Sequence, residues 1–214
     1  MGDFDSVRRV ADLAWAGQQQ QAIDKGTAAL AAAGLSAEDR IVLLGLRAES
    51  LIAVGDLDRA LTDAQAMRSL AAGRAELRAQ ALCCLALVHM RRGDVAPALV
   101  VAKAALKAAQ GSGRPALIGL AEWRLGEAYH REFTRQDLAL EHATRAAQFF
   151  ERLGDRARQG RALIVQALAH WRLGHRAECD CVAGQALGLA RDCGDLAGQA
   201  NALNLLTYHE SDLA

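Results

Sequence analysis

The sequence contains few residues that interrupt a helix or favour a strand. Only two of its 214 residues are proline, and aromatic residues make up 4%. β-Branched residues are also sparse, whereas alanine, leucine, arginine and glutamine, which form helices readily, dominate. This composition argues against a β-sheet protein and predicts an all-α chain.

Charge of one sign and long apolar runs are also lacking. The 25 Lys and Arg residues balance the 25 Asp and Glu residues, and the basic ones are dispersed. Phosphate-driven binding to nucleic acid therefore has little electrostatic basis. No apolar run approaches the roughly 18 residues of a spanning helix, and the acidic start, Met1-Gly-Asp-Phe-Asp5, does not resemble a signal peptide. We expect a soluble, cytoplasmic protein that binds neither membranes nor, directly, nucleic acid.

The five cysteines form no regular framework. Cys179 and Cys181 are two positions apart in a predicted helix, so their side chains diverge. Free thiols in a reducing compartment are therefore expected. His175, Cys179, Cys181 and Cys193 are the best candidate metal ligands, but no Cys-x-x-Cys spacing occurs and Cys181 points elsewhere. We predict no metal site and no cofactor.

Catalytic motifs are lacking as well. No glycine-rich loop joins a strand to a helix, and Gly111-Ser-Gly113 reads as a helix break. The acidic residues sit mainly at helix starts, where capping explains them. No Ser-His-Asp or Cys-His order has a supporting context. We therefore predict that the chain is not an enzyme.

Glycine recurs at a nearly constant interval. Gly17, Gly55 and Gly93 are equally spaced, and Gly174 follows after slightly more than two further intervals of the same length. An Ala-Leu or Ala-Ile pair follows each of the first three glycines at the same short distance. A period in this range is typical of stacked supersecondary units.

Gly-Asp pairs separate the predicted helices. Glycine adopts the left-handed conformation that ends one helix, and aspartate caps the next. The breaks define eleven helices, at about 4–16, 19–33, 37–54, 57–72, 74–92, 95–110, 115–131, 135–153, 156–173, 176–192 and 195–210. Because alternate breaks are short, neighbouring helices should pack as antiparallel hairpins.

The spacing of small residues resembles the tetratricopeptide repeat (TPR) family. One repeat has Gly55-Asp56 followed by Ala60-Leu61, the next has Gly93-Asp94 followed by Ala98-Leu99, and a third has Leu125-Gly126-x-x-Tyr129. The resemblance implies a right-handed α-solenoid that forms a single domain, 1–214. Its predicted parts are five antiparallel hairpins and a C-terminal helix, at about 4–33, 37–72, 74–110, 115–153, 156–192 and 195–210.

Three departures from the family pattern are informative. The period, about 40 residues, exceeds the roughly 34 of the family, and it resembles the long-period variety of bacterial signalling and transcription regulators. The turn Glu132-Phe-Thr-Arg-Gln-Asp137 lacks the glycine. Helix 195–210 has no following partner, so it is either a capping helix or the start of a sixth repeat in a longer protein.

The resemblance also implies a concave groove lined by the first helix of each hairpin. The predicted groove residues are Met90, Arg91, Trp123, Glu127, His130, Arg131, Arg161, Trp171 and Arg172. Arg91, Arg131 and Arg172 hold equivalent places in three repeats. Arginine binds carboxylates bidentately and tryptophan supplies apolar contact area, so such a row suits an acidic peptide. The alternative is structural, since cations suit helix C-termini and tryptophan packs between repeats.

Two functions follow from this interpretation. The first is a non-enzymatic protein–protein interaction module that binds a peptide or partner protein in its groove. The second is the sensory or regulatory TPR segment of a larger bacterial signalling protein, such as a nucleotide cyclase or transcription regulator, whose output domain lies outside this chain. In either case the terminal helices could support homo-oligomers.

Overall fold

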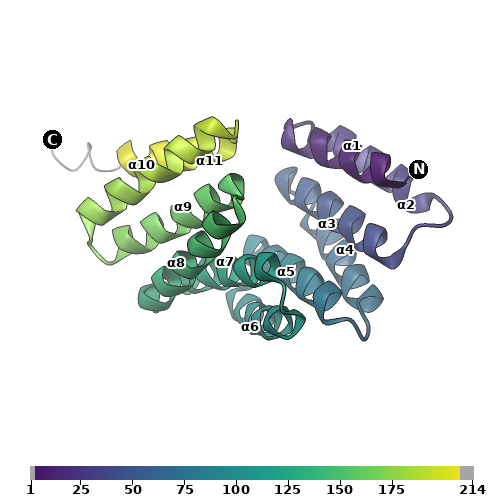
Figure 1. Ribbon diagram of the computed structural model, residues 1–214, viewed down its shortest axis with the longest axis horizontal. Helices are drawn as coiled ribbons and strands as arrows, with labels where there is room; N and C mark the ends of the chain where they lie inside the picture. Colours follow the sequence, from purple (N-terminus) through teal and green to yellow (C-terminus); the bar gives the residue numbers. More distant parts are fainter. Residues whose placement is uncertain (1–2, 208–214) are drawn as a thin grey trace. The chain divides into compact units, whose positions relative to one another are not determined.

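The computed structural model describes residues 3–207, and these residues form eleven α-helices (Figure 1). They are α1 (Asp3–Trp15), α2 (Gln19–Ala31), α3 (Ala37–Ala53), α4 (Leu57–Leu70), α5 (Ala75–Arg92), α6 (Val95–Ser112), α7 (Pro115–Glu132), α8 (Gln136–Leu153), α9 (Arg156–Arg172), α10 (Arg176–Asp192) and α11 (Leu196–Thr207). The predicted all-α class is confirmed, and the predicted helix ends agree closely with these bounds. Positions 208–210 of the last predicted helix lie outside the described residues.

The chain divides into two compact units, Met1–Ser112 and Gly113–Ala214, and each is described by itself. The first contains α1 to α6 and the second α7 to α11. The expectation of one domain over 1–214 stays a prediction.

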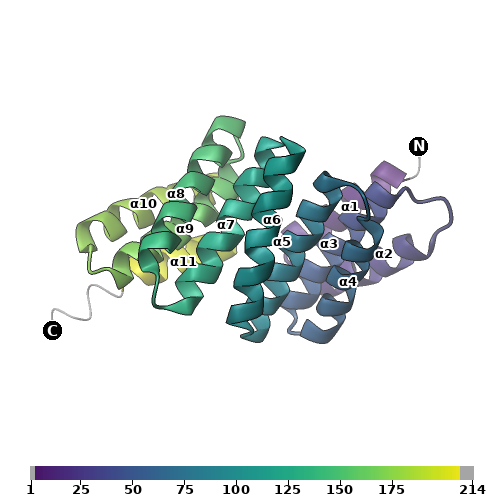
Figure 2. The same cartoon turned by 90° about the horizontal axis from the view of Figure 1, so that it is seen from below.

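Both units repeat the same packing pattern. Within each unit a helix packs on the next one in the chain, as α5 and α6 do side by side in Figure 2. Odd-numbered helices also pack on each other, α3 on both α1 and α5 in the first unit, and α9 on both α7 and α11 in the second. Each unit is therefore built from helix hairpins whose first helices form a continuous layer, as the TPR resemblance implies.

Small residues allow the two helices of a hairpin to approach closely. Between α7 and α8, a Cβ added to Gly126 would lie 3.1 Å from the backbone nitrogen of Ala143 and 3.3 Å from the carbonyl oxygen of Ala139. Ala139 and Ala143 are themselves fully buried. The Leu-Gly and Ala-Leu pairs of the repeat therefore mark the helix crossing, where only the smallest side chains fit.

The turns between helices have the chemistry that the sequence predicts. Gly55 has a φ of +85° in the α3–α4 turn, and Asp56 then accepts a hydrogen bond from the backbone N–H of Arg59 in the first turn of α4. Ser36 caps α3 in the same way through the backbone N–H of Asp39. Glycine ends one helix and a short polar side chain begins the next.

Candidate functional site

The nine predicted groove residues separate into a buried group and an exposed group. Met90 and Trp123 are buried, with exposed fractions of 1% and 7%. Glu127 and Arg161 make ion pairs within their unit. His130 is half-buried, and the remaining four are exposed: Arg91, Arg131, Trp171 and Arg172. Arg91 belongs to the first unit and the other three belong to the second.

Trp123 is part of the core of the second unit. Its ring lies edge-on to that of Phe150, with centroids 6.4 Å apart and planes at 86°. The Arg124 guanidinium lies 4.1 Å from the centre of the Trp123 ring and donates to Glu127 at 2.7 Å. Trp123 therefore packs α7 against its neighbours, which is the structural alternative raised for the tryptophans.

Arg161 ties α9 to the start of α11. Its Nε donates to Asp195 Oδ2 at 2.8 Å, and Asp195 Oδ1 accepts the backbone N–H of Gly198 at 3.1 Å. Burial by itself would raise the pKa of Asp195, but the hydrogen bonds from Arg161 and Gly198 outweigh it and hold that pKa below its ordinary value. This arginine has a role in packing the repeats, because its carboxylate partner caps a helix.

Arg172 contacts two aromatic side chains. The centre of its guanidinium is 4.7 Å from the ring centre of Phe133 and 4.8 Å from that of Trp171. Phe133 and Trp171 remain 61% and 37% exposed. Guanidinium groups are attracted to aromatic ring faces in this way, and they carry their N–H donors at their edge.

Arg131 and His130 lie near Arg172. Burial lowers the pKa of His130 most, and the positive charges of Arg172 and Arg131 lower it further, against the hydrogen bond that the imidazole donates to Gln136 and the charge of Glu127. Both arginines therefore lie within electrostatic range of this imidazole. His130 Nδ1 is 3.0 Å from Gln136 Oε1, which fixes the ring. We call His130, Arg131, Phe133, Trp171 and Arg172 the arginine–aromatic cluster.

Phe133 was not among the predicted site residues. It has a φ of +68° and is the only non-glycine residue with positive φ among residues 3–207. Gly93 and Gly174 hold positive φ in the corresponding turns of the neighbouring repeats. A left-handed conformation costs a residue with a side chain about 1–2 kcal/mol. The sequence signal was the glycine missing from the Glu132–Asp137 turn, which marks a strained and exposed aromatic residue.

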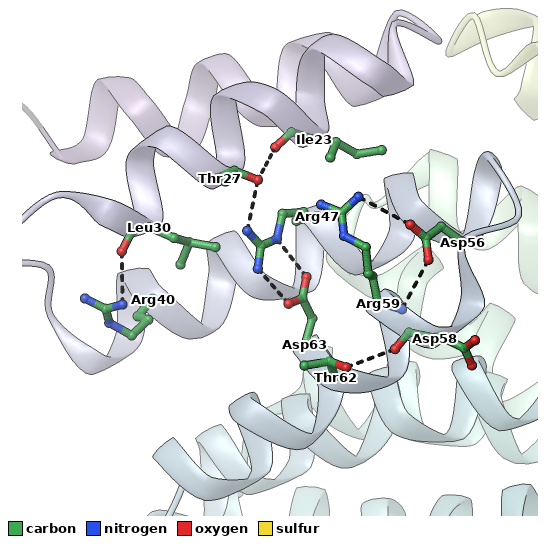
Figure 3. A network of polar contacts seen from close by, with 10 residues as sticks. All are labelled: Ile23, Thr27, Leu30, Arg40, Arg47, Asp56, Asp58, Arg59, Thr62 and Asp63. Carbon is green, nitrogen blue, oxygen red and sulfur yellow. Dashed lines mark hydrogen bonds and ion pairs between the residues drawn. The ribbon is translucent and has the colours of Figure 1, made fainter.

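The arginines of the cluster differ from the structural arginines in their partners. Arg47, shown in Figure 3, donates to both carboxylate oxygens of Asp63 at 2.7 and 2.8 Å and to the Thr27 hydroxyl at 3.0 Å. In the part of the chain that the structure describes, neither Arg131 nor Arg172 makes an ion pair or hydrogen bond with a carboxylate. Two cations without a carboxylate partner among the described residues therefore belong to this cluster, together with two exposed rings.

Comparisons with known proteins give a fold but no family. No protein-family model matches the chain, and no curated protein matches it either. The solved structures described below share at most 16% of their residues with this chain, and therefore establish the fold alone.

Several solved structures share this fold. A Rap protein complexed with Competence and Sporulation Factor matches with a TM-score of 0.76 and 16% identity, over 96% of this chain and 62% of that one. The apo form of RapI matches with a TM-score of 0.67 and 12% identity, over 99% and 84%. A STAND protein from Pyrococcus horikoshii, with a tetratricopeptide repeat sensor, matches with a TM-score of 0.68 and 11% identity, over 95% and 32%. The fold implied by the TPR resemblance is confirmed.

This chain thus spans less than two thirds of the Rap protein and about a third of the STAND protein. No helix within residues 3–207 has the length and apolar character needed to cross a bilayer. The five cysteines, all within residues 3–207, form no disulfide with one another.

Proposed function

We propose that the protein is a non-enzymatic interaction module that binds a peptide or partner protein on the layer formed by the odd-numbered helices of its second unit. One observation carries the proposal: the Arg172 guanidinium contacts both the Phe133 and Trp171 rings, and no described carboxylate pairs with it. Arg131 adds a second cation beside the same half-buried histidine. The layer includes α7 and α9, whose C-terminal ends carry the cluster.

The chemistry of the cluster favours an acidic residue with an apolar neighbour. A carboxylate accepts two parallel N–H bonds from the guanidinium edge, and such charge-assisted bonds are stronger than neutral ones. The exposed parts of Phe133 and Trp171 supply apolar contact area next to it. Arginine and tryptophan are enriched among the few side chains that dominate binding energy at interfaces.

A second candidate is a sensor segment within a longer signalling protein. It is favoured by the STAND structure, in which tetratricopeptide repeats form the sensor of a larger chain, and by the 32% of that chain which ours spans. The mechanism would be the same, because a sensor must also bind its ligand on the repeats. The two candidates differ in whether an output domain responds.

We also propose a cellular compartment and a type of organism for the protein. Free thiols fit a reducing compartment, and we propose the cytoplasm. The long repeat period suggests a bacterial regulator. Association through the terminal helices stays a prediction, which sedimentation at several concentrations would measure.

The test is binding to a defined peptide library. We would screen fluorescein-labelled nonapeptides in which a central Glu or Asp is flanked by Leu, Phe or Ala, with Gln and Asn versions as neutral partners. The wild-type chain should prefer acidic peptides, and Arg131→Ala/Arg172→Ala should weaken the tightest binder by at least about tenfold, or about 1.4 kcal/mol.

A matched control addresses the structural alternative. Arg152 and Arg191 are also exposed and lie in the last turns of α8 and α10, where they favour the helix C-terminus equally well. Arg152→Ala/Arg191→Ala should leave peptide binding unchanged. If both double variants lose binding equally, or if the cluster variant loses folding with binding, the proposal is wrong.

A further inference from the structure

Two histidines face each other across the α9–α10 turn. The Nδ1 atoms of His170 and His175 are 3.3 Å apart, and their ring centroids are 5.6 Å apart with planes inclined at 52°. These separations place the two Nδ1 atoms nearly on the line between the ring centres. Only one of the two nitrogens can therefore carry a proton, which it donates to the lone pair of the other.

His175 occupies a position where the neighbouring turns use aspartate. It is the N-cap residue of α10, and its side chain caps no backbone N–H group. Asp56 and Asp155 hold the N-cap positions of α4 and α9, and each accepts such a bond. The side chain of His175 is thus turned away from capping and toward His170.

The first unit contains the same arrangement with a carboxylate. In the α5–α6 turn, His89 Nδ1 lies 3.2 Å from Asp94 Oδ2. His89 and Asp94 hold the same places relative to Gly93 as His170 and His175 hold relative to Gly174. A carboxylate accepts the Nδ1–H of a charged imidazole, whereas two imidazoles that both carry a proton on Nδ1 have no acceptor between them.

The carboxylate that acts on His170 comes from α10. Burial lowers the pKa of His170 most, the charge of His175 lowers it further, and Glu178 in the first turn of α10 raises it. From α7 and α9, Glu127, Arg131 and Arg172 act on the neighbouring His130. Apart from Glu178, no described carboxylate acts on His170 in the way that Asp94 acts on His89.

We propose that the His170–His175 pair is an acid-sensitive latch that holds the α9–α10 turn and, through it, the adjacent Trp171 and Arg172 of the cluster. The regulatory part of this inference rests on the proposed binding function. A neutral or singly protonated pair keeps one proton between the nitrogens. A second proton places two N–H groups and two positive charges face to face, so the rings separate and the turn that follows Arg172 rearranges.

His175→Asp is the decisive variant because it restores the His–Asp pair of the α5–α6 turn. The first measurement needs no ligand: the indole N–H resonance of Trp171, assigned with Trp171→Phe, is followed by NMR from pH 7.5 to 5.0. In the wild type it should shift or broaden as the pair takes up its second proton, and in His175→Asp it should stay in place. Equal movement in both proteins would overturn the latch.

Thermal unfolding gives an independent readout. Between pH 7.5 and 5.0 the melting temperature of the wild type should fall by about 2–4 °C more than that of His175→Asp, because only the wild type loses the contact between the two imidazoles. His130 is present in both proteins and cancels in the comparison. An equal fall, or a larger one in the variant, would contradict the latch.

The binding measurement distinguishes failure of the latch from failure of the proposed function. The probe is the tightest fluorescein-labelled Glu nonapeptide of the library. Its affinity for the wild type should fall about tenfold more between pH 7.5 and 5.5 than its affinity for His175→Asp. If no peptide binds at pH 7.5, the proposed function fails, while the NMR and thermal measurements still decide whether the latch exists. If binding is equally pH-dependent in both proteins, the latch does not regulate the cluster.

Discussion

Two substitutions of Phe133 distinguish the effect of its backbone conformation on stability from the effect of its side chain on binding. Phe133→Ala and Phe133→Gly both remove the ring that contacts Arg172, but only glycine adopts the positive φ of +68° without a Cβ clash. The clash costs about 1–2 kcal/mol. The greater freedom of glycine in the unfolded chain returns about 0.4–1 kcal/mol. Phe133→Gly should therefore be about 1 kcal/mol more stable than Phe133→Ala.

The same pair of variants should bind equally weakly. Each loses a cation–π contact of about 0.5–1 kcal/mol and the apolar surface of an exposed ring, so peptide affinity should fall roughly tenfold in both. Urea denaturation measures the stability and fluorescence anisotropy measures the affinity. The assay thus contains its own control, because stability differs between the variants while affinity does not.

Two results would refute this reasoning. If the glycine variant is no more stable than the alanine variant, the turn is not strained and the phenylalanine needs no functional explanation. If both variants bind the library peptides as tightly as the wild type, the ring is not part of the binding site. Gly93→Ala, in the corresponding turn of the first unit, should lose about as much stability as separates the two Phe133 variants.

Three further predictions concern packing and protonation. Asp63→Ala should destabilise the protein by about 3–5 kcal/mol in urea denaturation, because it strands the Arg47 guanidinium among α2, α3 and α4; a loss below about 1 kcal/mol would show that this pair is only a surface contact. Gly126→Ala should be destabilising by about 1–3 kcal/mol since its Cβ meets backbone of α8, whereas Gly184→Ala, with open space around it, should stabilise by about 0.5–1 kcal/mol. The pKa of His130 is lowered from its ordinary 6.5, so the unfolded chain takes up this proton first and stability falls as the pH drops below about 6.5; His130→Gln should flatten that fall, and an unchanged profile would contradict the assignment.

The fold could be predicted from the sequence because its rules are local. Gly55 and Asp56 specify a turn by themselves, and Gly126 specifies a close helix crossing through its own lack of a side chain. The alternation of such signals over a fixed period then determines which helices pair. The fold of a repeat protein therefore follows without knowledge of contacts between residues far apart in the sequence, because each repeat packs on its neighbours along the chain.

The site could be predicted only in part. Arg131, Trp171 and Arg172, which the family register predicts in the groove, are exposed near the ends of α7 and α9, and their role in binding stays a prediction. The register could not tell that Trp123 turns into the core or that Arg161 has Asp195 as its partner. These outcomes depend on side chains far away in the sequence. Phe133 could not be predicted from the repeat pattern, because the pattern has a glycine at this position of the turn and assigns no role to a side chain there.

The packing of each helix on its near neighbours has a consequence for cooperativity. α3 contacts α1, α2, α4 and α5, and the packing within residues 3–112 of the first unit joins each hairpin to the adjacent ones. The free energy of folding is then a sum of contributions from each hairpin and from each interface between neighbouring hairpins. Folding can therefore begin in any hairpin and spread along the unit. Amide hydrogen exchange should accordingly report graded opening, with α1 and α2 exchanging earlier than α3 and α4, since α1 packs on α2 and α3 whereas α3 packs on four helices.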